Sequence, residues 1–168
     1  MIRIIDLKVL ARFAAVLVGV VVVQGLLSLK FRVFTYFDLP LICSIYYGFT
    51  LGNPLASIGI GSAVGLMQDS FSGAILGTNG FSKTLIGFLA ASAVSKFNVD
   101  QPITRFFALF FFSIGDVLLV TILGLVAGSG FGAIRSSGIS AWLLSAAFNT
   151  LLGLILFGSH DRWTDART

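Results

Sequence analysis

The chain has 168 residues, of which 57% are hydrophobic and 11% are charged, and its formal net charge is +4. A soluble domain has about 25% charged residues, so this composition excludes an ordinary water-soluble fold and indicates a protein of the lipid bilayer. Apolar segments take up nearly the whole length and leave no room for a soluble catalytic domain. The positive charges are scattered and form no basic run, which excludes a typical nucleic-acid-binding surface.

The first two apolar segments cover residues 13–29 and 39–51. Basic residues precede the first segment as in a signal peptide, but more apolar segments follow and no clear cleavage site is present, so we expect an uncleaved span. The second segment is short for a span. It either thins the bilayer, extends into the preceding aromatic loop, or is partly buried among other helices. Asp38 is expected to cap it, with Pro40 in its first turn, and Asn53 is expected to cap the next segment.

The third and fourth segments, 55–71 and 81–97, are expected to form an antiparallel helical hairpin. A period of four places residues on one helix face, and both segments carry such a stripe of small residues with one charge at its end. The stripes are Ser57, Gly61, Gly65 and Asp69 in the third segment and Lys83, Gly87, Ala91 and Ser95 in the fourth. In lipid, helices associate where small residues let their backbones approach, so the stripes predict the contact between these two helices.

The hairpin brings Asp69 and Lys83 to the same end, beside the Gly-rich loop 72–80 that contains Asn79. We expect Asp69 and Lys83 to form a local pair that fixes the hairpin, a hypothesis that a double-mutant cycle tests. Two other interpretations stay open. The charges and the loop are docking points for a partner, or Lys83 alone extends its ammonium group to the membrane surface. The loop is too apolar for solvent, so we expect it to fold against neighbouring helices.

The fifth and sixth segments, 106–127 and 139–158, each carry a polar residue in their interior. Asp116 lies about 16 Å along its helix and Asn149 lies at a similar depth, near the midplane of a hydrocarbon core about 30 Å thick. A charge at the centre costs about 2.5–3.5 kcal/mol, so Asp116 is expected to face away from lipid. One interpretation gives Asp116 a function, as a proton or ion site or as a contact to another membrane protein. The other gives it a structural role, in which a bond to Asn149 fixes the two helices together.

The sequence contains no Ser/His/Asp set, no metal-ligand cluster, no phosphate-binding glycine loop and no carboxylate pair. We therefore expect a single transmembrane domain over residues 1–168, an all-α bundle of six transmembrane helices without enzymatic activity, cofactor or metal. No convincing internal repeat is present, which weakens an inverted-repeat transporter interpretation.

The distribution of Lys and Arg favours both termini on the cytoplasmic side. With the N-terminus inside, seven basic residues lie on the inner side and four on the outer side. The inner residues are Arg3, Lys8, Arg12, Lys96, Arg105, Arg162 and Arg167, and the outer residues are Lys30, Arg32, Lys83 and Arg135.

Several short motifs follow one another over about residues 38 to 125. They are Asp38-Leu39-Pro40-Leu41, Tyr46-Tyr47-Gly48, Gly61-x-x-x-Gly65-Leu66-x-x-Asp69, Ser72-Gly73, Leu76-Gly77, Thr84-Leu85, Gly87-Phe88-Leu89 and Asp116. Their order, with the total length and the number of spans, resembles the bacterial rod shape-determining protein MreD family. The ordered set, more than any single motif, carries the resemblance.

This resemblance implies a small, non-enzymatic component of the bacterial plasma (inner) membrane that belongs to the machinery for lateral cell-wall elongation and peptidoglycan synthesis. The family's partners are the single-span protein MreC, the actin-like MreB filament, and the glycosyltransferase RodA with its penicillin-binding transpeptidase. The resemblance also implies a six-helix fold similar to the substrate-binding subunits of energy-coupling-factor vitamin transporters.

Two functions are therefore open. The favoured one is a membrane scaffold whose candidate contacts are Asp69, Lys83 and the loop 72–80. The alternative is a small-molecule-binding membrane subunit of a transporter, with Asp116 and Asn149 among its cavity walls, and it predicts a cavity of at least about 300 Å³. The outer helix halves offer few convergent polar groups for such a site. Binding of membrane lipid within the scaffold role is a third possibility.

Overall fold

The structure is a computed structural model that describes residues 7–30, 36–72, 75–99, 101–128 and 138–165, and their side chains except those of 7–14, 29 and 159–165. Six α-helices are described. They are α1 (Leu7–Lys30), α2 (Leu39–Leu51), α3 (Pro54–Ser72), α4 (Thr78–Val94), α5 (Pro102–Val126) and α7 (Ile139–Asp165). Each expected apolar segment therefore falls on a helix, although the helix of the fourth segment ends at Val94 instead of residue 97. The expectations for the loops around residues 31–35 and 129–137 lie outside the described residues.

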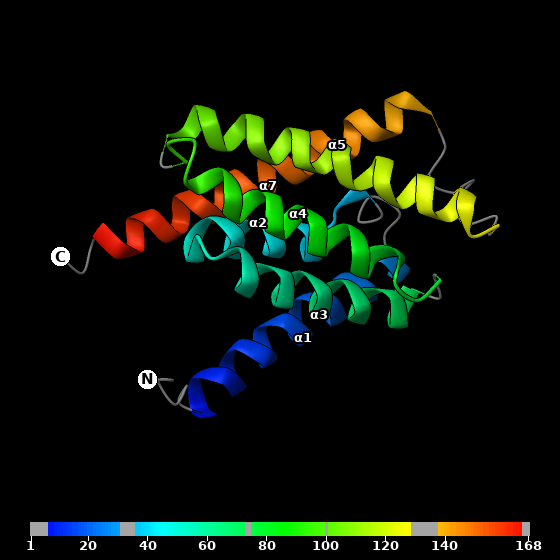
Figure 1. The fold of residues 1–168 in the computed structure, drawn as a ribbon, viewed down its shortest axis with the longest axis horizontal. Helices are drawn as coiled ribbons and strands as arrows, with labels where there is room; N and C mark the ends of the chain where they lie inside the picture. The colour runs from blue at the N-terminus through cyan, green and yellow to red at the C-terminus, as the bar shows by residue number, and fades with distance from the viewer. Residues whose placement is uncertain (1–6, 31–35, 73–74, 100, 129–137, 166–168) are drawn as a thin grey trace.

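Successive helices run in opposite directions across the molecule (Figure 1). The start of α1 and the end of α7 lie at the same end of the bundle, which we call the terminal end. The connection from α3 to α4 and the start of α2 lie at the opposite end, which we call the turn end. The alternation gives each helix an antiparallel neighbour in the chain.

The short α2 lies at the centre of the bundle and contacts each of the other five described helices. Its 13 residues span about 20 Å, less than a hydrocarbon core of about 30 Å. Leu41 and Ile45 are fully buried in a core cluster that also includes Leu109 of α5 and Phe157 of α7. Of the three explanations for its length, burial among other helices is therefore the one that the structure supports.

Helices α3 and α4 approach closely along the predicted stripe of small residues. A Cβ atom on Gly61 would lie 2.7 Å from the carbonyl carbon of Lys83 and 2.9 Å from the Cα of Thr84. A Cβ atom on Gly65 would lie 2.6 Å from the Cα of Gly80. Real Cβ atoms do not come so near to backbone, so glycine is required at both positions. The hairpin contact predicted from the sequence is confirmed.

The start of α4 differs from the prediction. We expected the helix from residue 81, but it begins at Thr78, so Asn79 and Gly80 are helical instead of lying in a loop. The reversal of the chain is made by Gly77, whose φ of 100° is a conformation that other residues rarely adopt. The shift matters because it places Asn79 one turn before Lys83 on the same helix face.

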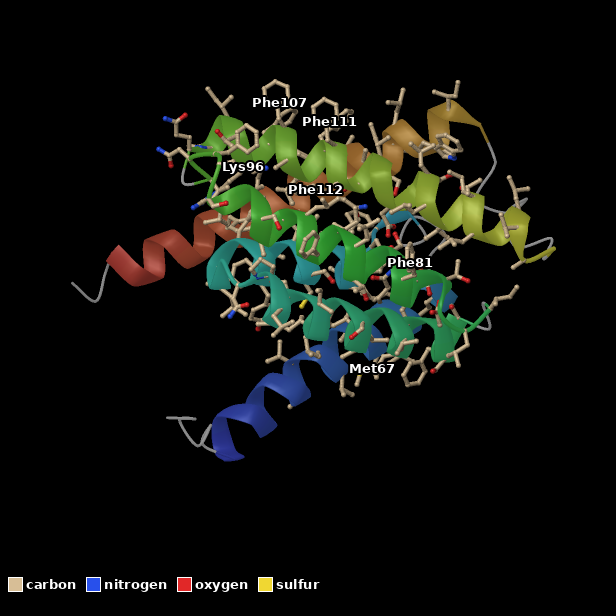
Figure 2. All side chains as sticks on the ribbon, viewed as in Figure 1. Met67, Phe81, Lys96, Phe107, Phe111 and Phe112 are labelled. Carbon is tan, nitrogen blue, oxygen red and sulfur yellow. The ribbon has the colours of Figure 1, made fainter. Side chains whose placement is uncertain are left out.

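The outside of the bundle is apolar and much of its inside is polar. Exposed large apolar side chains occur on every described helix, and on α5 they include Phe107 at 52% and Phe111 at 63% exposure. Figure 2 shows these two rings pointing outward, while Phe112 points toward α4. Such a surface is unusual for a soluble monomer and suits contact with lipid. Two described helices, Pro102–Val126 and Ile139–Gly158, are long and apolar enough to cross a membrane.

The glycine contacts give a first prediction. Changing Gly61→Ala forces α3 away from α4 and should lower the free energy of unfolding by about 1–3 kcal/mol, the usual cost of overpacking. The matched control is Gly59→Ala on the same helix, where an added Cβ meets nothing within 4 Å. Thermal unfolding of the detergent-solubilised protein measures both. Equal melting temperatures for the two variants would contradict the close helix contact.

Candidate functional site

Lys83 is buried at the centre of a group of polar side chains near the turn end. Its side chain has 0% exposure, and its Nζ lies 2.9 Å from Oδ2 of Asp38 and 3.1 Å from Oδ1 of Asp116. The ammonium group also donates to Oδ1 of Asn79 at 3.0 Å. A lysine has three donor hydrogens, so these three partners from α4, α5 and the start of α2 account for all of them.

Asp116 is the partner of Lys83 on α5. Its side chain is fully buried, and its Oδ1 also accepts a 2.6 Å hydrogen bond from the hydroxyl of Ser82. Ser82 and Lys83 are neighbours on α4, so both bonds tie α5 to the same point of that helix. The charge of Asp116 is therefore paired with that of Lys83, which is the condition for burying a charge away from water.

Asp38 is the partner of Lys83 at the start of α2. Its Oδ1 accepts from the backbone N–H of Leu41 at 3.1 Å, so the predicted cap of α2 is confirmed. The amide Nε2 of Gln68 on α3 lies 3.4 Å from the same oxygen. One carboxylate therefore caps α2, pairs with α4 and contacts α3, and the positive end of the α2 dipole favours its negative charge.

The short segment around Asp38, residues 36–39, is bonded by side chains from several helices, and we call it the entry segment. Gln24 of α1 donates to the carbonyl of Phe37 and accepts from the N–H of Leu39. Asn149 of α7 accepts from the N–H of Asp38 at 2.8 Å. Ser145 of α7 donates to the carbonyl of Tyr36. With the bonds of Asp38 itself, the entry segment connects α1, α3, α4 and α7 directly and α5 through Lys83.

Asp69 holds the start of α4. Its carboxylate accepts from the backbone N–H groups of Gly77 at 2.8 Å, Asn79 at 3.0 Å and Gly80 at 3.1 Å. It also accepts from the side-chain amide of Asn79 at 2.8 Å. The first N–H groups of a helix have no acceptor within the helix. Here the buried carboxylate of Asp69 on α3 is their acceptor. Asn79 then links Asp69 to Lys83.

Two expected pairs are wrong. Asp69 and Lys83 lie at the same end of the hairpin, but they are linked through Asn79 and the ion pairs of Lys83 are with Asp38 and Asp116. Asp116 is bonded to α4 and not to Asn149, which binds the entry segment instead. The reason is a different partner in each case: the Asp69 carboxylate binds the N–H groups at the start of α4, and the side-chain oxygen of Asn149 accepts from the N–H of Asp38.

Sequence reasoning missed the role of Asp38 as an ion-pair partner and the role of Gln24. A signal was present, because Asp38, Asp69 and Lys83 each fall near a segment end on the same side of the membrane in the alternating topology.

In the part of the chain that the structure describes, no group of three His, Cys, Asp or Glu side chains could hold a metal ion. The hydrogen bonds of Lys83 and Asp69 run to other groups of the protein, so the arrangement can fix helices but offers no free acid, base or nucleophile from these two residues.

Comparison with known families matches residues 10–159 to rod shape-determining protein MreD. The chain belongs to the MreD family. The match extends from α1 to α7 and so covers the whole buried charge cluster. Membership supports a role in rod shape determination and a location in the bacterial membrane, with which the two long apolar helices agree. No curated protein and no solved structure matched the chain.

The cluster predicts which pair of residues is energetically coupled. In double-mutant cycles, Lys83→Met with Asp116→Asn should show a coupling of at least about 1 kcal/mol, because removing one member of a buried pair leaves the other charge unpaired. Lys83→Met with Asp69→Asn should show a smaller coupling, since Asn79 separates them. Unfolding free energies in detergent give both values. The reverse order of couplings would favour the pair first expected from the sequence.

Proposed function

We propose that this protein is a non-enzymatic scaffold of the machinery that elongates the bacterial cell wall and maintains rod shape. The observation that carries the proposal is the buried cluster of Asp38, Lys83 and Asp116, whose charges are bound to one another across three helices. Such a cluster makes the bundle rigid. A rigid bundle with an apolar outer surface suits a protein that holds other membrane proteins in place.

We propose that all six helices cross the plasma membrane and that both ends of the chain are cytoplasmic. The alternating helix directions and the shared position of the start of α1 and the end of α7 support this arrangement (Figure 1). Lys83 is neutralised by its ion pairs with buried carboxylates, so we leave it out when the basic residues of the outer side are counted. The inner excess becomes seven against three, and the turn end faces outward. The likeness to substrate-binding subunits of energy-coupling-factor transporters belongs to the same proposal.

The outward-facing turn end is the proposed contact surface for partners. Ile75 and Leu76, in the connection between α3 and α4, are 41% and 69% exposed although both are large and apolar. Asp69 of α3 holds the end of this connection by accepting a hydrogen bond from the N–H of Gly77. The proposed partners are an MreC-like single-span protein, a RodA-like glycosyltransferase with its penicillin-binding transpeptidase and, on the cytoplasmic side, an MreB-like actin filament.

One observation bears on the alternative, a small-molecule-binding subunit of a transporter. The bundle has cavities of about 400 Å³, above the lower limit for ligand sites. Their walls are mainly apolar, and neither Asp116 nor Asn149 lines the two cavities described. The polar residues on which the transporter interpretation depended are bonded within the bundle, so the scaffold is the better supported function.

The scaffold proposal predicts the result of depletion and of site-specific cross-linking in cells. Depletion should turn rods into round cells, and a copy with a photo-cross-linking residue in place of Leu76 should restore rods. Irradiation of these cells should then join the protein to an MreC-like or RodA-like partner, identified by mass spectrometry.

The control is the same substitution at Leu55, which is 79% exposed but lies at the start of α3, at the opposite end of that helix. It should restore rods and give no product with these partners. Normal rods after clean deletion, in cells without a second copy of the gene, would end the proposal. Cross-linked products with these partners in equal yield from both positions would rule out the turn end as the contact surface.

A further inference from the structure

A cavity of about 400 Å³ lies between α1 and α3, beside the entry segment. Its apolar walls include Val21 and Leu26 of α1, Pro40 of α2 and Phe71 of α3. The lining residues of α1 fall in its second half and those of α3 in its last turns, so the cavity lies toward the turn end. It opens between two helices whose outer surfaces are apolar, which makes the bilayer the natural source of an occupant.

Polar groups occur on one part of this wall. Gln24, Ser28, Gln68 and Ser72 line the cavity together with the apolar residues. The hydroxyls of Ser28 and Ser72 and the amide of Gln24 are bonded to backbone groups of the protein. Gln68 differs, because its buried Oε1 has no hydrogen-bond partner among the described residues. A buried acceptor without a partner costs about 1–3 kcal/mol, so a donor supplied from the cavity stabilises the protein.

The amide of Gln68 can turn toward the cavity. Among the described residues its side chain makes one bond, the long 3.4 Å contact from Nε2 to Asp38, and the terminal torsion of a glutamine side chain has a broad range of allowed angles. A hydroxyl or ammonium donor that enters beside Gln68 therefore finds an acceptor at the apolar wall.

A positive charge stands at the edge of the same region. Lys30, the last residue of α1, is exposed and lies one helical turn beyond Leu26. The described residues that line the cavity include no Asp or Glu. The charge therefore favours an anionic group, such as a phosphate, at the level where α1 ends.

We propose that this cavity binds the phospholipid phosphatidylglycerol from the outer leaflet. One acyl chain lies along the apolar wall, the phosphate pairs with Lys30, and a headgroup hydroxyl donates to Oε1 of Gln68. Phosphatidylcholine lacks both the net negative charge and the hydroxyl donors, so it is the discriminating comparison. The proposal rests on the location in the membrane and on the outward orientation of the turn end proposed above, and it is independent of cell-wall partners.

Two glycines of α1 allow a matched test. Gly25 lines the cavity and Gly19 does not, yet a Cβ added at either position meets nothing within 4 Å. The changes Gly25→Leu and Gly19→Leu are thus the same substitution on one helix, and both replace a poor helix former with a good one. Only the first one fills the cavity.

The experiment counts lipids bound to the delipidated, detergent-solubilised full chain by native mass spectrometry, with phosphatidylglycerol or phosphatidylcholine added. Wild type and Gly19→Leu should retain phosphatidylglycerol in preference to phosphatidylcholine, and Gly25→Leu should lose the retained molecule. Lys30→Gln should reduce the preference by about fivefold, the effect of one lysine near anionic headgroups.

Melting curves of both leucine variants show that each one is folded. Retention of phosphatidylglycerol by Gly25→Leu at the wild-type level would overturn the proposal. So would equal loss in the two leucine variants, or equal binding of the two lipids by wild type.

Discussion

The structure depends on one buried ammonium group and the carboxylates that surround it. Lys83 has no contact with solvent, so its charge is tolerated only because Asp38 and Asp116 lie within 3.1 Å. A buried ion pair adds little net stability compared with apolar packing, but it permits few alternative arrangements of the helices. We interpret the cluster as the device that fixes the register of α2, α4 and α5. The hydrogen bonds of the entry segment then hold α1 and α7 in place relative to this cluster.

Close backbone approach is the second constraint, and it works together with the first. Lipid supplies no hydrophobic force that drives one helix against another, so contact depends on packing and on buried polar bonds. Gly61 and Gly65 let α3 lie directly on α4, and Gly48 of α2 lies against Gly87 and Ala90 of α4. At these separations the side chains of Asp69 and Asn79 reach each other and the start of α4. The glycines thus bring the helices together, and the polar residues select one arrangement.

Much of the fold could be predicted from the sequence because its signals are local. The six apolar segments, the short second helix, the cap at Asp38 and the stripe through Gly61 and Gly65 depend on spacing within about 20 residues. The partners of Lys83 could not be predicted in this way. They lie 45 and 33 residues away in the chain, and the long lysine side chain binds whichever carboxylates the positions of α2 and α5 provide. The start of α4 was misplaced because Gly77, one of several glycines in the loop, makes the turn.

The most direct test of this account is the chemical reactivity of Lys83 in the folded protein. Reductive methylation of the detergent-solubilised chain, followed by peptide mass spectrometry, measures each lysine separately. Lys96, which lies exposed just after α4, is the internal reference (Figure 2). The account predicts that Lys96 is modified rapidly, while Lys83 stays unmodified until the protein is unfolded. Modification of Lys83 at the rate of Lys96 in the folded protein would contradict a buried, paired ammonium group at the centre of the bundle.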